Sequence, residues 1–378
     1  MYCAPVMAPA AAPLLGVTPA AVGYFVTVAY LGSMIGTVTA GGWVARFGPI
    51  RVSQAGMLLC ACGLAVAATG ALPAVLAGAL LIGLGYGPAT PASSVILARA
   101  APSGMVALTF SIKQTGVPLG TAIAGVAVPP LLLGLGWQGA ALAVGGVCAL
   151  FGVAITPLRG RYDAERDRAA PVSLRSAFSP VLLVVRDGKI LGLALTSFIY
   201  GGVQITLVAY LVAFLSDSFA LSLVLAGLVM AVSQLASVAG RIVWGIVADH
   251  VLSRRATLGM LGVGMGLTGL VALGAGPGWP LWTLFVFAAA LGATAVGWNG
   301  VFLAELIRLS PKERIGDITG GSAFFTFLGV VVTPSIFHLT LNVTSSYGTT
   351  YALFGIPALL VGVALLATAK IARDDGQS

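Results

Sequence analysis

Long apolar stretches recur along almost the whole of this 378-residue chain and limit what it can fold into. A helix rises 1.5 Å per residue, so about 20 apolar residues cross roughly 30 Å of hydrocarbon. The segment LTSFIYGGVQITLVAYLVAFL, residues 195–215, is apolar on every face. Strands of a membrane barrel would instead alternate in polarity over about 10 residues. With 8% charged residues, the sequence predicts an all-α membrane protein.

The hydropathy pattern predicts eleven membrane-spanning helices after a short proline-rich segment, residues 1–16. The predicted ranges are 20–45, 52–71, 74–99, 105–133, 138–157, 189–215, 221–249, 256–275, 280–306, 316–341 and 348–371. The run YGPATP, residues 86–91, should break or bend the helix that contains it.

Basic residues predict the orientation in the membrane. Of the 19 lysines and arginines, all except Lys113 and Arg241 lie in or beside alternate connections, and the connections between these contain none. By the positive-inside rule, the basic connections and the C-terminus are cytoplasmic. The net charge of +8 is therefore a signal of topology and does not indicate a nucleic-acid partner. We expect a multi-pass protein of the cytoplasmic (inner or plasma) membrane.

The segment 158–188 is the one long polar stretch and is interpreted as a cytoplasmic linker between helix bundles of residues 1–157 and 189–378. An offset of 204 residues aligns Gly36 with Gly240 and Gly41 with Gly245. Related halves that face a site near the membrane midplane are typical of secondary transporters. The same offset would start the first helix about 15 residues before Met1. We therefore expect an incomplete N-terminus, with residues 1–16 as a partial first helix.

A motif follows the 221–249 helix: Gly245-x-x-x-Asp249-His250-x-x-x-Arg254-Arg255. It resembles the cytoplasmic signature of the major facilitator superfamily, which lies between the second and third helices of a half. The first half carries a degraded copy with Gly41, Arg46 and Arg51, in which Ala45 replaces the aspartate. The resemblance implies two pseudo-symmetric six-helix bundles in a 12-helix fold, with the first helix truncated.

The resemblance also implies a conformational latch in the inward-closed state. Asp249 should face the positive end of the 105–133 helix. Asp317 would replace the missing aspartate of the first half and lie near Arg46 or the end of the 20–45 helix. The expected latch residues are Gly41, Arg46, Arg51, Gly245, Asp249, Arg254, Arg255 and Asp317. The alternative is that these charges only mark the membrane boundary.

Two cations lie within predicted helices. Arg241 is eight residues before Asp249, or about 12 Å into the bilayer, where insertion costs roughly 2.5–3.5 kcal/mol. Lys113 lies at a similar depth, and the carboxylates Asp249, Glu305 and Asp317 are all close to helix ends. A substrate anion would supply the counter-charge. The alternative is that each cation snorkels or binds backbone carbonyls at a kinked helix. By resemblance, several carboxylate carriers place an arginine four residues before the motif glycine, as Arg241 precedes Gly245.

Further substrate-binding candidates are amides and aromatics that would suit an organic ion: Gln114, Tyr200, Gln204, Gln234, Trp298 and Asn299. For any one of them the alternative is an interhelical hydrogen bond of around 0.6 kcal/mol.

The predicted function is secondary transport of a small, carboxylate-like organic anion by alternating access, with Arg241 and Lys113 facing one central cavity. The expected partners are this substrate and the lipid bilayer, and a proton is a candidate coupling ion. No cofactor, metal site or catalytic cluster is expected, so the chain is not interpreted as an enzyme. The alternatives are efflux of a drug or hydrophobic compound, or a non-transporting sensor derived from this fold.

Overall fold

The computed structural model describes residues 3–17, 22–170 and 178–374, and within these ranges it contains helices and no strands. Ten stretches in them are long and apolar enough to cross a membrane. One of these, Val106–Tyr162, has 57 residues, which is enough for two crossings at 1.5 Å per residue. The predicted all-α membrane class is therefore confirmed.

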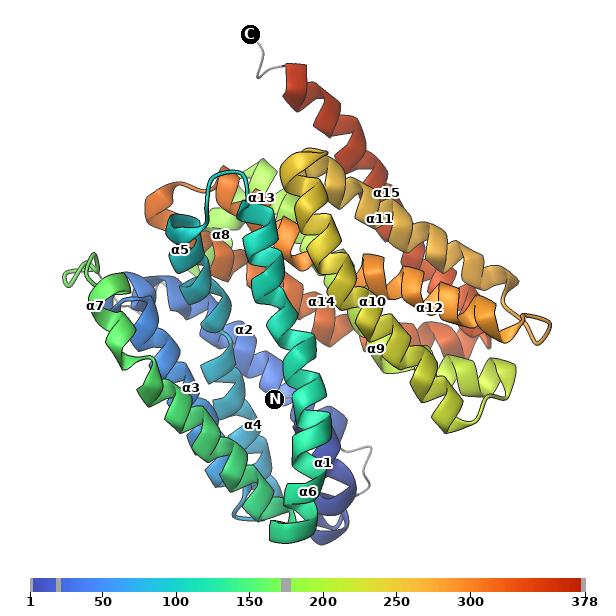
Figure 1. Cartoon of the computed structure of the whole chain (residues 1–378), viewed down its shortest axis with the longest axis horizontal. Helices are drawn as coiled ribbons and strands as arrows, with labels where there is room; N and C mark the ends of the chain where they lie inside the picture. The colour runs from blue at the N-terminus through green and yellow to red at the C-terminus, as the bar shows by residue number, and fades with distance from the viewer. Residues whose placement is uncertain (1–2, 18–21, 171–177, 375–378) are drawn as a thin grey trace. The chain divides into compact units, whose positions relative to one another are not determined.

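Fifteen α-helices follow one another along the described residues (Figure 1). Their bounds are α1 (Ala4–Ala11), α2 (Val22–Phe47), α3 (Pro49–Ala67), α4 (Leu72–Tyr86), α5 (Ala89–Ala100), α6 (Val106–Ala154), α7 (Arg159–Tyr162), α8 (Ser179–Arg186), α9 (Gly188–Phe219), α10 (Leu223–His250), α11 (Arg254–Val271), α12 (Leu281–Ala295), α13 (Asn299–Leu309), α14 (Ile315–Thr344) and α15 (Tyr347–Asp374).

The helices break where glycine and proline predict it. The helix predicted over 74–99 is divided into α4 and α5 at Gly87 and Pro88. Two predicted helices appear as the single element α6, but Gly136 has φ 67° and ψ 176° within it. Glycine adopts this positive φ at little cost, so the break expected at residues 134–137 is present.

The chain forms two compact units. The first contains Met1–Ala100, Val117–Leu191 and Ser310–Phe327; the second contains Ala101–Gly116, Gly192–Leu309 and Leu328–Ser378. Each unit therefore includes part of a helix from the other half of the sequence, the start of α14 in the first and the start of α6 in the second. The bundles of residues 1–157 and 189–378, joined by the linker 158–188, stay a prediction.

The linker contributes a buried carboxylate that the sequence did not single out. Asp163 is 1% exposed and accepts hydrogen bonds from the backbone amides of Ile50 at 2.8 Å and Arg51 at 3.2 Å. These amides belong to the first turn of α3, whose N–H groups have no acceptor within the helix. Asp163 therefore ties the residues after α7 to the start of α3.

Small residues allow close helix contacts in the first unit, where α4 packs against α2 and α3 (Figure 1). A methyl group added at Gly83 would overlap the backbone carbonyl of Ala29 on α2. Replacing Gly83 with alanine should therefore destabilise the protein by about 1–3 kcal/mol. Thermal unfolding in detergent measures this loss. Gly146, on the exposed face of α6, has no atom within 4 Å of such a methyl, so Gly146→Ala should leave the unfolding temperature unchanged or raise it. Equal effects of the two substitutions would contradict this account.

Candidate functional site

Arg241 lies in the middle of α10 and is 2% exposed. Its Nε donates to the carbonyl of Val296 at 3.0 Å, and its Nη1 donates to the carbonyl of Gln114. A buried guanidinium requires such acceptors, because leaving water costs several kcal/mol per ion. Arg241 therefore connects three segments: α6, α10 and the break between α12 and α13.

Lys113 lies next to this contact on α6. Its Nζ donates to Gln114 Oε1 at 2.9 Å, so both positive charges lie against the same residue. Gln114 thus accepts from both cations, from Arg241 through its backbone and from Lys113 through its side chain. The second compact unit contains all three residues, so the structure brings these predicted site residues together.

A second polar cluster contains three more of the predicted residues. Gln204 Oε1 accepts from Trp298 Nε1 at 3.1 Å and from Asn299 Nδ2 at 3.0 Å. Asn299 Nδ2 also lies 3.5 Å from the carbonyl of Val296, which is the carbonyl that Arg241 binds. The Val296 carbonyl therefore connects the Gln204 cluster with Arg241.

Tyr200 and Gln234 have other surroundings. The Tyr200 hydroxyl is buried and donates to the carbonyl of Leu258 at 2.9 Å. Its ring packs edge-to-face on Trp298, with 5.8 Å between ring centroids. Tyr200 thus supports the indole that donates to Gln204. Gln234 is half-buried on α10, and its amide lies 4.0 Å from the sulfur of Met230.

Asp249 occupies the position predicted for it. Its side chain is fully buried, and its two oxygens accept from the amides of Ala107 at 3.0 Å and Leu108 at 2.8 Å. Both amides lie in the first turn of α6, where the helix dipole favours a negative charge. Arg254 Nη2 lies 3.4 Å from the same carboxylate.

Gly245 lies close to the same helix. A methyl group added at Gly245 would come within 2.9 Å of Leu108 and Ser111, so this glycine permits the close approach of α10 to α6. The predicted contact of Asp249 is confirmed, and its role as a latch stays a prediction.

In the first unit Asp317 lies against Gly41 of α2, since a methyl group added at Gly41 would overlap the carboxylate. This is the predicted neighbourhood, near the end of α2.

Three arginines of the expected latch make separate contacts. Arg46 donates to the carbonyl of Ala170 at 3.4 Å, Arg51 to that of Phe47 at 3.5 Å, and Arg255 to Thr368 Oγ1 at 2.9 Å.

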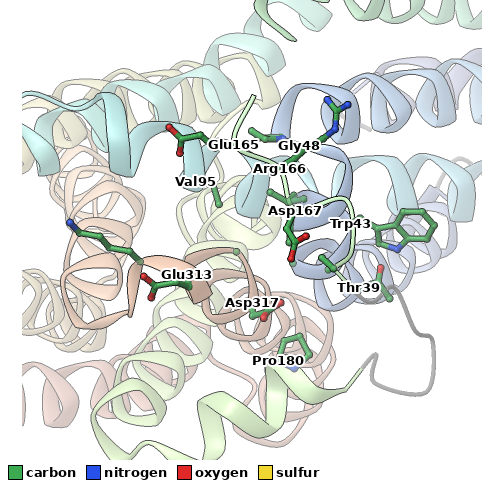
Figure 2. A pocket seen from close by; sticks show the side chains of 18 of the residues that line it. Thr39, Trp43, Gly48, Val95, Glu165, Arg166, Asp167, Pro180, Glu313 and Asp317 are labelled. Atoms are coloured by element: carbon green, nitrogen blue, oxygen red, sulfur yellow. The ribbon is translucent and has the colours of Figure 1, made fainter. Parts of the chain in front are cut away.

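A cavity of about 680 Å³ lies beside Asp317 in the first unit. Figure 2 shows Glu165 and Asp167 of the linker, and Glu313 and Asp317 around the start of α14, among its lining residues. Arg99 and Glu165, which also line it, form an exposed ion pair at 2.6 Å. None of the predicted substrate-binding residues lines this cavity.

Three residues of the site, Val296, Ala107 and Leu108, were missed by the sequence analysis. Val296 contributes only its carbonyl, which no side-chain pattern can indicate, although it begins the interruption VGW between α12 and α13. Ala107 and Leu108 likewise contribute backbone amides to Asp249. The signal for all three is the helix end itself, where backbone groups lack partners within the helix.

An all-α membrane fold with interrupted helices around buried polar groups is typical of secondary transporters. The family model described as Major Facilitator Superfamily matches residues 1–334 and, in a second match, residues 193–376. This chain belongs to the major facilitator superfamily.

Individual relatives are more distant. The nitrate/nitrite transporter NrtP of Nostoc punctiforme (strain ATCC 29133 / PCC 73102) is 28% identical over 193 residues, which are 50% of this chain and 35% of that protein. The chain thus matches about a third of the length of this relative.

Solved structures share the fold. The human organic anion transporter MFSD10 (TETRAN) superposes with a TM-score of 0.73 at 16% identity, covering 91% of this chain and 83% of that one. The proton:xylose symporter XylE gives a TM-score of 0.75 at 16% identity, covering 96% and 91%. The Escherichia coli fucose:proton symporter FucP gives 0.74 at 15% identity, covering 97% and 96%.

Proposed function

We propose that this chain is a secondary transporter that moves a small anion across the membrane by alternating access, with Arg241 and Lys113 as the groups that bind the anion. The observation that carries the proposal is the pair of cations brought together at Gln114. Like charges at close range in a low-dielectric site raise the free energy of the empty protein. A bound anion would lower it, and the protein would therefore favour binding.

The three carboxylates that the sequence analysis compared with these cations make other contacts. Asp249 accepts from the amides of α6, and Glu305 accepts from Arg308 at 2.7 Å and 2.8 Å. Asp317 lies beside Gly41 in the first unit. These contacts hold the three carboxylates elsewhere, and the proposal rests on the two cations that meet at Gln114.

The chemistry of an arginine favours a planar oxyanion. A guanidinium can donate two parallel hydrogen bonds to a carboxylate, and nitrate presents a similar pair of oxygens. Two of the proteins described above are named as anion transporters, one for nitrate and nitrite and one for organic anions. The symporters for xylose and fucose show that the fold alone does not select an anion. We propose that the substrate is a small carboxylate. Nitrate is the second anion to test beside it.

Lys113→Gln tests the proposal with purified protein in liposomes. The wild type should take up a labelled small carboxylate in a saturable manner, and the variant should bind it about three- to tenfold more weakly. A lysine is a point charge that lacks the bidentate fork of an arginine, so the loss should be smaller than that for Arg241. Gln114 would retain its backbone contact with Arg241. A wild-type protein that neither transports nor is thermally stabilised by carboxylates or nitrate would contradict the proposed function.

We also propose the orientation that the basic residues predict, with the linker and the C-terminus on the cytoplasmic side of the cytoplasmic membrane. The support is the segregation of lysines and arginines among the connections.

A further inference from the structure

Pro118 lies inside α6, four residues after Gln114. In an α-helix the amide of each residue donates to the carbonyl four residues earlier, and proline has no amide hydrogen. Pro118 therefore removes the helical donor that the Gln114 carbonyl would otherwise have. Arg241 Nη1 donates to this carbonyl.

The second acceptor of Arg241 lies at a helix end. Val296 follows the end of α12 at Ala295, and α13 begins only at Asn299. Carbonyls at a helix end lack amide donors within the helix, and Arg241 Nε donates to this one at 3.0 Å. Two contacts on different nitrogens, one from α6 and one from the segment between α12 and α13, orient the plane of the guanidinium.

We propose that Pro118 is a positioning residue of the anion site: it makes the Gln114 carbonyl available to Arg241 and thereby holds the guanidinium in the orientation that binds the anion. This inference rests on the proposed function. Lys113 is held by the side chain of the same glutamine. The missing amide at Pro118 therefore acts on Arg241 through the carbonyl of Gln114. Gln114 is also the residue that follows Lys113.

The same helix offers a matched control. Pro129 is also internal to α6 and is exposed. The corresponding carbonyl belongs to Gly125, and among the hydrogen bonds of the described residues no side chain donates to it. If the prolines only bend α6, replacing either one should have the same effect. If Pro118 positions Arg241, only its replacement should affect Arg241.

The first measurement is anion affinity. Pro118→Ala restores an amide that competes with Arg241 for the Gln114 carbonyl. We expect about tenfold weaker binding of the carboxylate, because one hydrogen bond to a charged group is shared or lost, with the maximal uptake rate kept within about twofold. Pro129→Ala should change the affinity by less than about twofold. In an Arg241→Lys background, Pro118→Ala should also add less than about twofold, because lysine has no planar guanidinium for the two carbonyls to orient. Pro118→Ser restores the same amide and is the second variant if the alanine protein is not recovered.

The second measurement needs no anion. Phenylglyoxal modifies arginine side chains, and mass spectrometry can follow Arg241 with the exposed Arg161 as an internal reference. Modification of Arg241 should be several-fold faster in Pro118→Ala than in the wild type or in Pro129→Ala. If Arg241 is modified faster in Pro118→Ala although no anion binds, Pro118 does position Arg241 and the proposed transport function is wrong. If the Pro118 and Pro129 variants behave alike in both measurements, the positioning proposal is wrong.

Discussion

Arg241→Gln should abolish saturable anion uptake while leaving membrane insertion intact. The substitution removes the guanidinium that is the proposed principal binding group. Its loss also lowers the cost of insertion, which for a central arginine is roughly 2.5–3.5 kcal/mol. The glutamine amide can still donate to one of the two carbonyls that Arg241 binds, at Gln114 and Val296. We therefore expect a folded protein whose unfolding temperature falls modestly, by the equivalent of about 1–3 kcal/mol for an acceptor left without its donor.

The measurement is uptake of the labelled carboxylate into liposomes, together with thermal unfolding in the presence and absence of the anion. Anion-dependent stabilisation should disappear with uptake. Arg161→Gln is a matched control, because Arg161 is exposed on α7 and its guanidinium lies over the ring of Tyr162. It should transport as the wild type does. Normal transport by the Arg241 variant would refute the anion site and leave only the assignment to the superfamily.

The fold could be predicted from the sequence because a membrane strongly restricts which segments can cross it. Spanning helices need long apolar runs, and proline or glycine interrupts them, as at Gly87 and Pro88 and again at Gly136. The position of Asp249 could also be predicted, since a carboxylate just after an apolar run can reach a helix N-terminus. These features depend on side-chain type and spacing, which a sequence displays directly.

The partners of Arg241 could not be predicted in the same way. The sequence showed a charge at depth and left two explanations, a ligand or backbone carbonyls at a kinked helix. In the structure the guanidinium donates to the carbonyls of Gln114 and Val296. The contacts with backbone carbonyls are therefore present. A guanidinium has five N–H donors, and a backbone contact that orients it is compatible with a ligand. Tyr200 illustrates the same limit, because its bond to the Leu258 carbonyl depends on how α9 packs on α11.

Asp249→Ala should weaken the contact between α6 and α10 and reduce transport by at least about tenfold. Two amides of α6, at Ala107 and Leu108, would lose their acceptor, and Arg254 would lose its carboxylate partner. Hydrogen bonds to a buried charge contribute about 1.5–3 kcal/mol each, so the loss of two is on the order of 3–6 kcal/mol. In an alternating-access cycle, a loss of this size would shift the population away from the state that contains the contact by more than a hundredfold.

A thiol reporter can detect this shift. Ser111 is fully buried on α6, beside Gly245 and Gly300, and Ser111→Cys is nearly isosteric. With the native cysteines replaced, the new thiol in detergent-solubilised protein should react slowly with a maleimide, and much faster after Asp249→Ala. Asp187 provides the control, because it is exposed and accepts from the amides of Lys189 and Ile190 in the first turn of α9, the helix that follows it. Asp187→Ala should cost only about 0.5–2 kcal/mol and leave the labelling unchanged. The latch has no basis if the thiol stays protected and transport persists without Asp249. Faster labelling with lost transport would mean that the carboxylate holds α6 and α10 together in a state the transport cycle requires.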